Sequence, residues 1–437
     1  MRTGNPWRCF PLLVALAPLA LVGVFSTFSV ESVVAERERS SGLDLETVDP
    51  SSVGLSAKRL ERLDAGMQRM VDEGQLAGVV TLLARHGKIA FADVVGVQDV
   101  ESQRPMARDS IFRIFSMTKP ITGVAMMMLY EEGKWRMNDP VSRYIPMFGD
   151  LKVHVGENSD GSMRLENLEH EITMRELMTH TAGLGYVLNP RHPVTQMFVE
   201  RGVLNPMAPL QTMIDKLVNV PLVAQPGRRW IYSSAVDVQG YLVEKLSGMP
   251  FAKFLEERLF TPLGMVDTAF YVPPGKASRL ALRHSVDENG KLVLNSRGEA
   301  FSSSPPGPSG GGGLFGTVDD YLRFTQMLLN EGEFDGNRLL APRTVEMMRT
   351  NHLSAEATEN MRPGMGFGMD FMIYMDPAAA GEPHAEGSYY WLGIDGTWFW
   401  IDPVLDFAFV GMIQHQGPAQ AEVHGLSRNL VYQAIMH

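Results

Sequence analysis

The stretch Phe115-Ser116-Met117-Thr118-Lys119-Pro120 contains a Ser-x-x-Lys tetrad and opens a long apolar segment. The residues from Pro120 to Glu132 are predicted to form one helix, because apolar side chains recur at helical spacing and Gly133 follows as a stop signal. If the helix begins near Ser116, the side chains of Ser116 and Lys119 lie on the same face, about one turn apart. The hydroxyl and the amine can therefore meet.

A serine hydroxyl attacks a carbonyl carbon efficiently only when a neighbouring group takes its proton. An amine can do this when apolar surroundings or nearby charge lower its pKa. The apolar residues on both sides of Ser116 predict such surroundings for Lys119, and the helix N-terminus adds positive potential. The competing interpretation is a helix-capping serine followed by a solvated lysine, since Ser-x-x-Lys also recurs by chance. The tetrad thus points to a nucleophilic serine whose proton acceptor is a lysine.

The first 35 residues have the pattern of a secretory signal peptide. Arg2 and Arg8 precede a nearly continuous apolar run, and Val33 and Ala35 occupy the small-residue positions of a cleavage site. We therefore expect residues 1–35 to be removed and the protein to be exported, to the periplasm or the extracellular space. The alternative is an uncleaved N-terminal anchor, because the apolar run is longer than a minimal signal sequence. Membrane association is expected only in that case.

Composition limits the chemistry that the mature chain can carry out. The single cysteine, Cys9, lies in the expected signal peptide, so the mature chain would have no disulfide, no thiolate metal ligand and no cysteine nucleophile. The formal net charge is −11 and the segment 1–35 carries +1, which leaves −12 on the mature chain. An acidic chain without a basic patch does not favour nucleic acid as a partner.

The pattern of apolar residues predicts strands near both ends of the chain. Residues 56–74 are expected to form an amphipathic helix, followed by a β-hairpin of residues 79–84 and 89–95. Three further strand-like runs occur near the C-terminus, at residues 389–392, 397–401 and 407–413.

The middle of the chain is predicted to be mostly helical, with residues 151–171 as a polar and irregular insertion. We therefore expect an α+β fold in which the two ends together build one antiparallel sheet flanked by helices, with a mostly helical lobe inserted. The sheet lobe would comprise about residues 50–115 and 310–437, and the helical lobe about residues 116–309.

Two further motifs contain candidate functional residues. Tyr232 lies between a turn and a predicted helix, where its phenol could enter a cleft beside an ammonium group. Most tyrosines, however, are packing residues. Gly307-Pro308-Ser309-Gly310-Gly311 matches the nucleophile elbow G-x-S-x-G. Because Ser-Ser-Ser-Pro-Pro precedes it and cannot easily form a central strand, we interpret Ser309 as a loop residue.

The order of the motifs carries a family resemblance. Ser116-x-x-Lys119, Tyr232-Ser-Ser and Trp391-Leu392-Gly393 resemble the three ordered motifs of the serine β-lactamase and penicillin-binding-protein superfamily. The chain is most similar to the class C-like branch, which includes the family VIII carboxylesterases. The segment from His180 to Leu184 and the glycine run before Leu314 are similar to connecting segments of that branch. The resemblance extends from about Leu55 to the C-terminus.

The resemblance implies a β-lactamase-like fold over residues 36–437 and a serine hydrolase that needs no metal or organic cofactor. Ser116 would be the nucleophile, with Lys119 and Tyr232 transferring its proton. The backbone N–H groups of Ser116 and Ile394 would hold the oxyanion. The substrate pocket would be formed by Ser234, Trp391, Leu392 and Gly393.

Departures from the family pattern bear on the substrate. Ser234 stands where β-lactamases of the branch usually have asparagine, and Trp391-Leu392 replace Lys-Thr. A lysine there would bind the carboxylate of a β-lactam. The apolar replacement favours neutral esters. A β-lactamase, a D,D-peptidase or D-aminopeptidase, an acyltransferase and a non-catalytic penicillin-binding-like module remain as alternatives. A small-molecule ester or amide is the expected ligand.

Three residues near these motifs have no assigned role from sequence. His180 is a candidate acid or base, although a buried histidine bonded to loop backbone is the more frequent case. His415 is unassigned. Asp395, in the turn after the third motif, could tune the pocket or cap its own turn, and we favour the cap.

Overall fold

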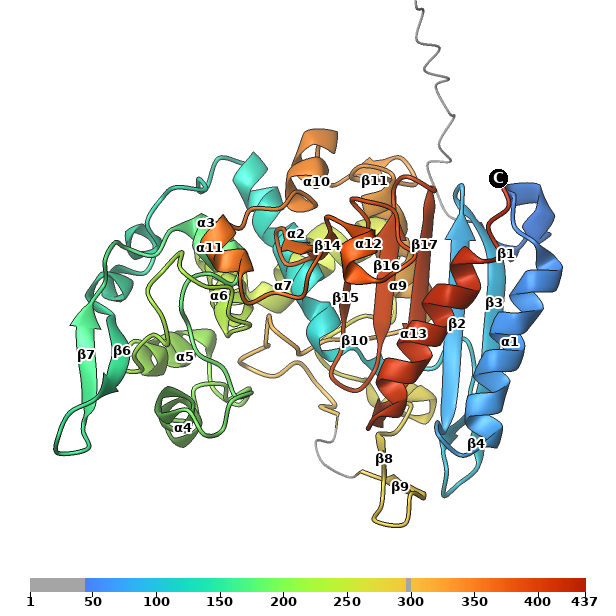
Figure 1. Ribbon diagram of the computed structural model, residues 1–437, viewed down its shortest axis with the longest axis horizontal. Helices are drawn as coiled ribbons and strands as arrows, with labels where there is room; N and C mark the ends of the chain where they lie inside the picture. The colour runs from blue at the N-terminus through green and yellow to red at the C-terminus, as the bar shows by residue number, and fades with distance from the viewer. Residues whose placement is uncertain (1–43, 296–299) are drawn as a thin grey trace, which may run out of the picture. The chain divides into compact units, whose positions relative to one another are not determined.

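The computed structural model describes residues 44–295 and 300–437. The expected signal peptide lies outside these residues. Within them, nine strands form one sheet (Figure 1). Its order across the sheet is β1 (Asp44–Thr47), β3 (Lys88–Asp99), β2 (Gly78–Arg85), β17 (Phe407–Met412), β16 (Trp398–Asp402), β15 (Tyr389–Leu392), β14 (Met372–Tyr374) and β13 (Met365–Phe367), with β4 (Arg104–Pro105) paired to β3.

The N-terminal and C-terminal parts of the chain meet in the middle of this sheet. Strand β2 pairs with β17 in antiparallel register, so that Leu82 lies opposite Val410. The expectation of one sheet built from both ends is therefore confirmed. The sheet is not wholly antiparallel, because β1 pairs with β3 in parallel. A helix, α1 (Ala57–Asp72), separates β1 from the β2–β3 hairpin, and such a long connection does not impose the antiparallel arrangement of a tight turn.

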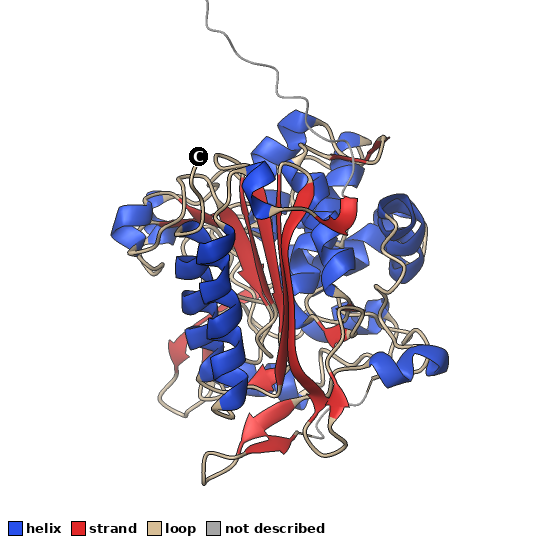
Figure 2. Cartoon of the chain, turned by 90° about the vertical axis from the view of Figure 1, so that its right-hand side faces the viewer, coloured by secondary structure: helices blue, strands red, loops and turns tan. Residues whose placement is uncertain are grey.

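Helices cover both faces of the sheet, as Figure 2 shows with the sheet between them. Alternate residues of β16 point to opposite faces. Trp398 and Trp400 pack with residues of α1 and of α13 (Ala419–Tyr432). Phe399 and Ile401 belong to the larger core on the other face, with α2 and α9. The remaining helices are α2 (Thr118–Glu131), α3 (Met174–Met178), α4 (Pro193–Glu200), α5 (Leu210–Leu217), α6 (Ala235–Ser247), α7 (Phe251–Leu255), α8 (Thr261–Leu263), α9 (Val318–Leu329), α10 (Pro342–Met348), α11 (Ala355–Thr358) and α12 (Pro377–Ala380).

Side-chain caps fix the starts of two helices. The Ser56 hydroxyl accepts a hydrogen bond from the Arg59 N–H at 3.4 Å and caps α1. Thr173 and Glu176 form a complete capping box at the start of α3. No helix in the described ranges is both long and apolar enough to cross a bilayer.

The prediction of an irregular segment at residues 151–171 is wrong. Strands β6 (Lys152–Glu157) and β7 (Met163–Asn167) form an antiparallel hairpin there. Most of its side chains are exposed, so its sequence lacks the apolar face by which a strand is usually recognised. The buried side chain of Val153 and a backbone bridge to Leu222 attach the hairpin to the helical part.

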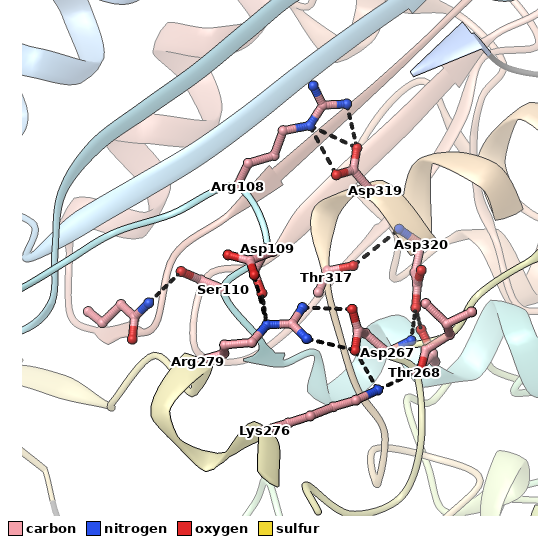
Figure 3. A network of polar contacts seen from close by, with 12 residues as sticks. Arg108, Asp109, Ser110, Asp267, Thr268, Lys276, Arg279, Thr317, Asp319 and Asp320 are labelled. Carbon is pink, nitrogen blue, oxygen red and sulfur yellow. Dashed lines mark hydrogen bonds and ion pairs between the residues drawn. The ribbon is translucent and has the colours of Figure 1, made fainter. Parts of the chain in front are cut away.

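A network of charged groups holds the segment that leads to the Ser-x-x-Lys tetrad (Figure 3). Arg279 donates to both carboxylate oxygens of Asp267, at 2.9 and 2.6 Å, and to the Asp109 carbonyl at 2.8 Å. Arg108 donates to both carboxylate oxygens of Asp319 at the start of α9. The chain runs from this network through β5 (Phe112–Arg113), which pairs with β10 (Phe315–Gly316), directly into the tetrad.

Candidate active site

Ser116 lies in a short 3-10 turn, Phe115–Met117, immediately before α2. The preceding residue, Phe115, has a φ of 45°, a conformation that costs free energy for a residue with a side chain and is often found at functional sites. The Ile114 N–H donates to the Leu314 carbonyl at 3.0 Å, and the Ile114 carbonyl accepts from the Thr397 hydroxyl at 3.2 Å. These contacts to two distant segments hold the turn, and the Ser116 side chain remains partly exposed.

Two residues predicted from the sequence, Lys119 and Tyr232, contact the hydroxyl of Ser116. The Lys119 ammonium donates to Ser116 Oγ at 3.3 Å, and the Tyr232 hydroxyl donates to the same atom at 2.6 Å. Lys119 Nζ also donates to the Gly311 carbonyl at 2.5 Å and lies 4.6 Å from the centre of the Tyr232 ring. The nucleophile candidate is thus within hydrogen-bond reach of both groups that could move its proton.

The electrostatic state of Lys119 differs from the sequence-based expectation. Burial lowers the pKa of the completely buried Lys119, but Tyr232, Tyr186 and Asp237 outweigh burial and raise this pKa above its ordinary value. The expectation of a lowered lysine pKa is therefore wrong. The residues near Lys119 in the sequence are mostly apolar, so they gave no sign of the tyrosine and aspartate oxygen atoms that lie near its amine in space. Lys119 remains an ammonium at neutral pH, and Tyr232 is the other group in contact with the serine.

His180 supports the segment that carries Tyr232. It is completely buried, its Nδ1 accepts from the Ser233 N–H at 3.2 Å, and its ring centre is 5.1 Å from that of Tyr232. Burial lowers the pKa of His180 well below its ordinary value, with a smaller effect from Lys119. A neutral imidazole bonded to loop backbone agrees with the packing interpretation rather than with an acid or base.

The third motif packs beside the tetrad. The Trp391 ring lies 5.5 Å from the Tyr232 ring. The prediction of Leu392 as a pocket residue is wrong, because its side chain lies on the opposite face of the sheet, with Trp398 and Trp400. A side chain at Gly393 would collide with the Thr397 hydroxyl at 2.3 Å and the Ile114 carbonyl at 2.6 Å, so only glycine allows this strand end to approach the nucleophile turn. Within residues 44–295 and 300–437, no carbonyl accepts the N–H of Ile394, which leaves that group available for a ligand.

The predicted pocket residue Ser234 is not at the surface of a pocket. It is completely buried at the start of α6, and its hydroxyl donates to the Gly185 carbonyl at 3.1 Å. The prediction that Ser234 lines the substrate pocket is therefore wrong, because the start of α6 directs its side chain toward the loop before α4. Ser309 lies in a loop, as expected, and its hydroxyl donates to Asp237 Oδ1 at 2.6 Å.

The turn-capping role expected for Asp395 is also corrected. Its carboxylate pairs with Arg283 and accepts from the Gln414 side chain at 3.1 Å. His415 is buried, its N–H donates to the Asp395 carbonyl at 2.8 Å, and burial lowers the pKa of its ring. Arg283, Gln414 and the Gly311 carbonyl were not predicted as parts of the site, since nothing local in the sequence distinguishes them.

A mixed sheet with helices on both faces, and a serine on a helix start beside a lysine and a tyrosine, defines the class of β-lactamase-like proteins. Comparison with known families agrees, because the family model described as Beta-lactamase matches residues 63–433. The chain belongs to the beta-lactamase family.

Curated relatives and a solved structure are similar over most of the chain. Protein Rv1367c of Mycobacterium tuberculosis (strain ATCC 25618 / H37Rv) is 35% identical over 366 residues, which is 82% of this chain and 90% of that protein. Esterase EstB of Burkholderia gladioli is 32% identical, over 82% of this chain and 91% of the relative. The structure of EstCE1, described as a hydrolase with promiscuous acyltransferase activity, superposes with a TM-score of 0.71 at 27% identity and covers 86% of this chain and 98% of its own.

Proposed function

We propose that this protein is a serine hydrolase that cleaves carboxylic esters through a covalent acyl-Ser116 intermediate. The observation that carries the proposal is the single hydroxyl of Ser116 in contact with both Lys119 Nζ and Tyr232 Oη. The similarity to Esterase EstB and to the hydrolase EstCE1 supports an ester as the substrate.

In the first half of the reaction, Tyr232 acts in its phenolate form: Ser116 Oγ attacks the ester carbonyl carbon, and its proton passes to the phenolate oxygen of Tyr232. The Lys119 ammonium stabilises the negative charge that this transfer moves. The oxyanion of the tetrahedral intermediate accepts the N–H groups of Ser116 and Ile394; loss of one such donor typically costs about 100-fold in rate. The carbon–oxygen bond to the alcohol then breaks, and the alcohol leaves with the proton held by Tyr232.

In the second half, water attacks the acyl carbon. Tyr232, again beside Lys119, takes the proton of the water and returns it to Ser116 Oγ as the carboxylic acid leaves. The same two side chains thus serve both halves, and no further group is required to balance the protons.

The surroundings of the third motif favour a neutral ester over a β-lactam. The apolar ring of Trp391, 5.5 Å from that of Tyr232, lies where a carboxylate-binding lysine would otherwise stand. Turnover of nitrocefin should therefore be negligible beside turnover of p-nitrophenyl butyrate. A preference for nitrocefin would identify a β-lactamase.

The deciding experiment is the intact mass of the mature protein after brief exposure to a fluorophosphonate or a p-nitrophenyl ester. Wild type should gain one adduct and Ser116→Ala none, with parallel loss of ester turnover. Labelling that persists in Ser116→Ala and disappears in Ser309→Ala would move the nucleophile to Ser309. A folded wild type without any adduct would identify a non-catalytic binding module.

Acyl transfer to an acceptor other than water is the second candidate, because EstCE1 is described as having promiscuous acyltransferase activity. Adding a primary alcohol to the ester assay separates the two. A hydrolase yields mainly the free acid, whereas an acyltransferase yields mainly the new ester.

We also propose export, with cleavage after Ala35, on the basis of the N-terminal sequence pattern. N-terminal sequencing of the protein from the fractionated native host tests this. A chain beginning at Glu36 outside the cytoplasm is expected, and a chain retained in the membrane with residue 2 intact would identify an anchor.

A further inference from the structure

A largely apolar cavity of about 320 Å³ lies beside the glycine segment that follows Ser309. Its walls include Leu210 and Met213 of α5, Phe270, Phe315 and the glycine segment that ends with Gly312 and Gly313. Cavities of roughly 300 Å³ and above with apolar walls are typical sites for small ligands.

The glycine segment connects this cavity to the reacting groups. The Gly311 carbonyl accepts from Lys119 Nζ at 2.5 Å. A Cβ atom placed on Gly312 would have the Phe115 backbone as its nearest neighbours, at 3.7 and 3.9 Å. Phe115 directly precedes Ser116, so the partly exposed Gly312 lies between the cavity and the nucleophile turn.

Gly312 differs from its neighbours in the room around it. A Cβ atom would collide at Gly310, Gly311 and Gly313, where the nearest atoms lie 2.5, 2.6 and 2.8 Å away. At Gly312 the contacts are ordinary van der Waals distances. The absence of a side chain at Gly312 therefore leaves usable space between Phe115 and the cavity. Tight backbone packing does not require glycine at this position.

Several polar groups of the cavity wall are already engaged with protein groups, although Asp237 Oδ2 has no hydrogen-bond partner among the described residues. The Ser309 hydroxyl donates to Asp237 Oδ1 at 2.6 Å, and that oxygen also accepts from the Gly311 N–H at 3.1 Å. The Arg113 guanidinium lies over the Phe115 and Phe315 rings, at 5.4 and 4.9 Å. What the wall offers to a ligand is mainly apolar surface, which suits a hydrocarbon chain.

We infer that this cavity receives the acyl chain of the substrate ester, which makes the enzyme selective for aliphatic acyl groups longer than acetyl. The inference rests on the proposed function. The acyl chain is the better occupant than the alcohol, because the alcohol must escape to solvent after the first half of the reaction. The acyl group stays bonded to Ser116 until water releases it.

The test measures kcat/KM for p-nitrophenyl acetate, butyrate, hexanoate and octanoate with wild type, Gly312→Leu and Met213→Ala. Wild type should prefer a chain longer than acetyl. Gly312→Leu fills the space beside Phe115 and should lower the hexanoate-to-acetate ratio by about tenfold or more, the usual size of selectivity set by fit in an apolar pocket. Met213→Ala enlarges the far wall and should shift the preference toward octanoate.

Gly275→Leu is the matched control, since Gly275 is exposed and has no atom within 4 Å of a built Cβ. It should leave the chain-length profile unchanged. Acetate esters of ethanol and hexanol give the alcohol-side comparison, and Gly312→Leu should affect both equally.

An unchanged acyl-chain profile in both cavity variants, or a change that follows the alcohol instead, would overturn the inference. These outcomes are distinct from failure of the proposed function. If the proposed function itself failed, wild type would show neither acetate turnover nor labelling by a fluorophosphonate.

Discussion

The buried carboxylate of Asp395 is paired with the guanidinium of Arg283, a residue 112 positions earlier in the chain. The Asp395 side chain is completely buried and that of Arg283 is 15% exposed. Asp395 directly follows Ile394, whose N–H is proposed to hold the oxyanion. The Arg283 guanidinium also lies 5.4 Å from the centre of the ring of Phe115, the residue before Ser116. One ion pair thus links the two sides of the proposed oxyanion site.

We predict that Asp395→Asn lowers the free energy of unfolding by about 3 kcal/mol, because it leaves a largely buried guanidinium without its charged partner. Urea unfolding measures this. Ester turnover in the folded variant should also fall, since the turn at Ile394 loses its anchor. Glu346→Gln, in the exposed Arg343–Glu346 pair, is the control and should change stability by less than about 1 kcal/mol. Equal effects of the two substitutions would contradict a structural role for the Arg283 pair.

For Lys119, the raised pKa predicts an electrostatic role rather than that of a neutral base. Lys119→Met should lower kcat/KM by about 100-fold or more. Because the ammonium favours the deprotonated form of the hydroxyls that face it, its loss should also move the alkaline rise of the pH–rate profile to higher pH. Lys119→Arg keeps the charge and should retain more of the wild-type pH dependence. An identical pH profile in all three proteins would exclude this role.

Stability in acid should depend on Asp267, in the network of Figure 3. Burial raises the pKa of Asp267, but hydrogen bonds from Arg279 and Lys276 outweigh it and hold the pKa below its ordinary value. The folded state therefore binds fewer protons than the unfolded state around pH 4, so this stabilisation exists above that pH and is lost as pH falls through the folded pKa. Asp267→Asn should cost about 1–2 kcal/mol at pH 7 and much less near pH 2. A cost that does not change with pH would argue against the ion pairs.

Asp93 should have the opposite effect on stability. Burial, with repulsion from Asp64, raises the pKa of Asp93 to about 6. The folded state then binds more protons than the unfolded state between about pH 4 and 6, so stability falls as pH rises through this range and the cost stays constant above it. Asp93→Asn should stabilise the protein by about 1 kcal/mol at pH 8 and hardly at all at pH 4. Asp64 is exposed, so Asp64→Asn should give a smaller gain of the same sign. Destabilisation by Asp93→Asn at pH 8 would mean that the carboxylate makes a favourable contact.

Much of the fold could be predicted because its signals are local. The capping box at Thr173 and Glu176 and the β2–β3 hairpin each depend on residues that are close in sequence. The β6–β7 hairpin was missed because its stabilising contact, Val153 against Leu222, is distant and its own side chains are mostly exposed. The identities of Ser116, Lys119 and Tyr232 as candidates came from motif order, whereas the orientation of Ser234 came only from the packing of a helix start against a loop.

The sequence by itself determined that Ser116 and Lys119 share one face at the start of a helix, since a spacing of three residues fixes this through helical geometry. Tertiary structure alone decided what surrounds them. Tyr232, the Gly311 carbonyl and the Arg283–Asp395 pair all come from segments more than 100 residues after the tetrad. The pKa of Lys119 depends on the oxygen atoms of Tyr232, Tyr186 and Asp237, because electrostatic energy depends on distance in space rather than along the chain.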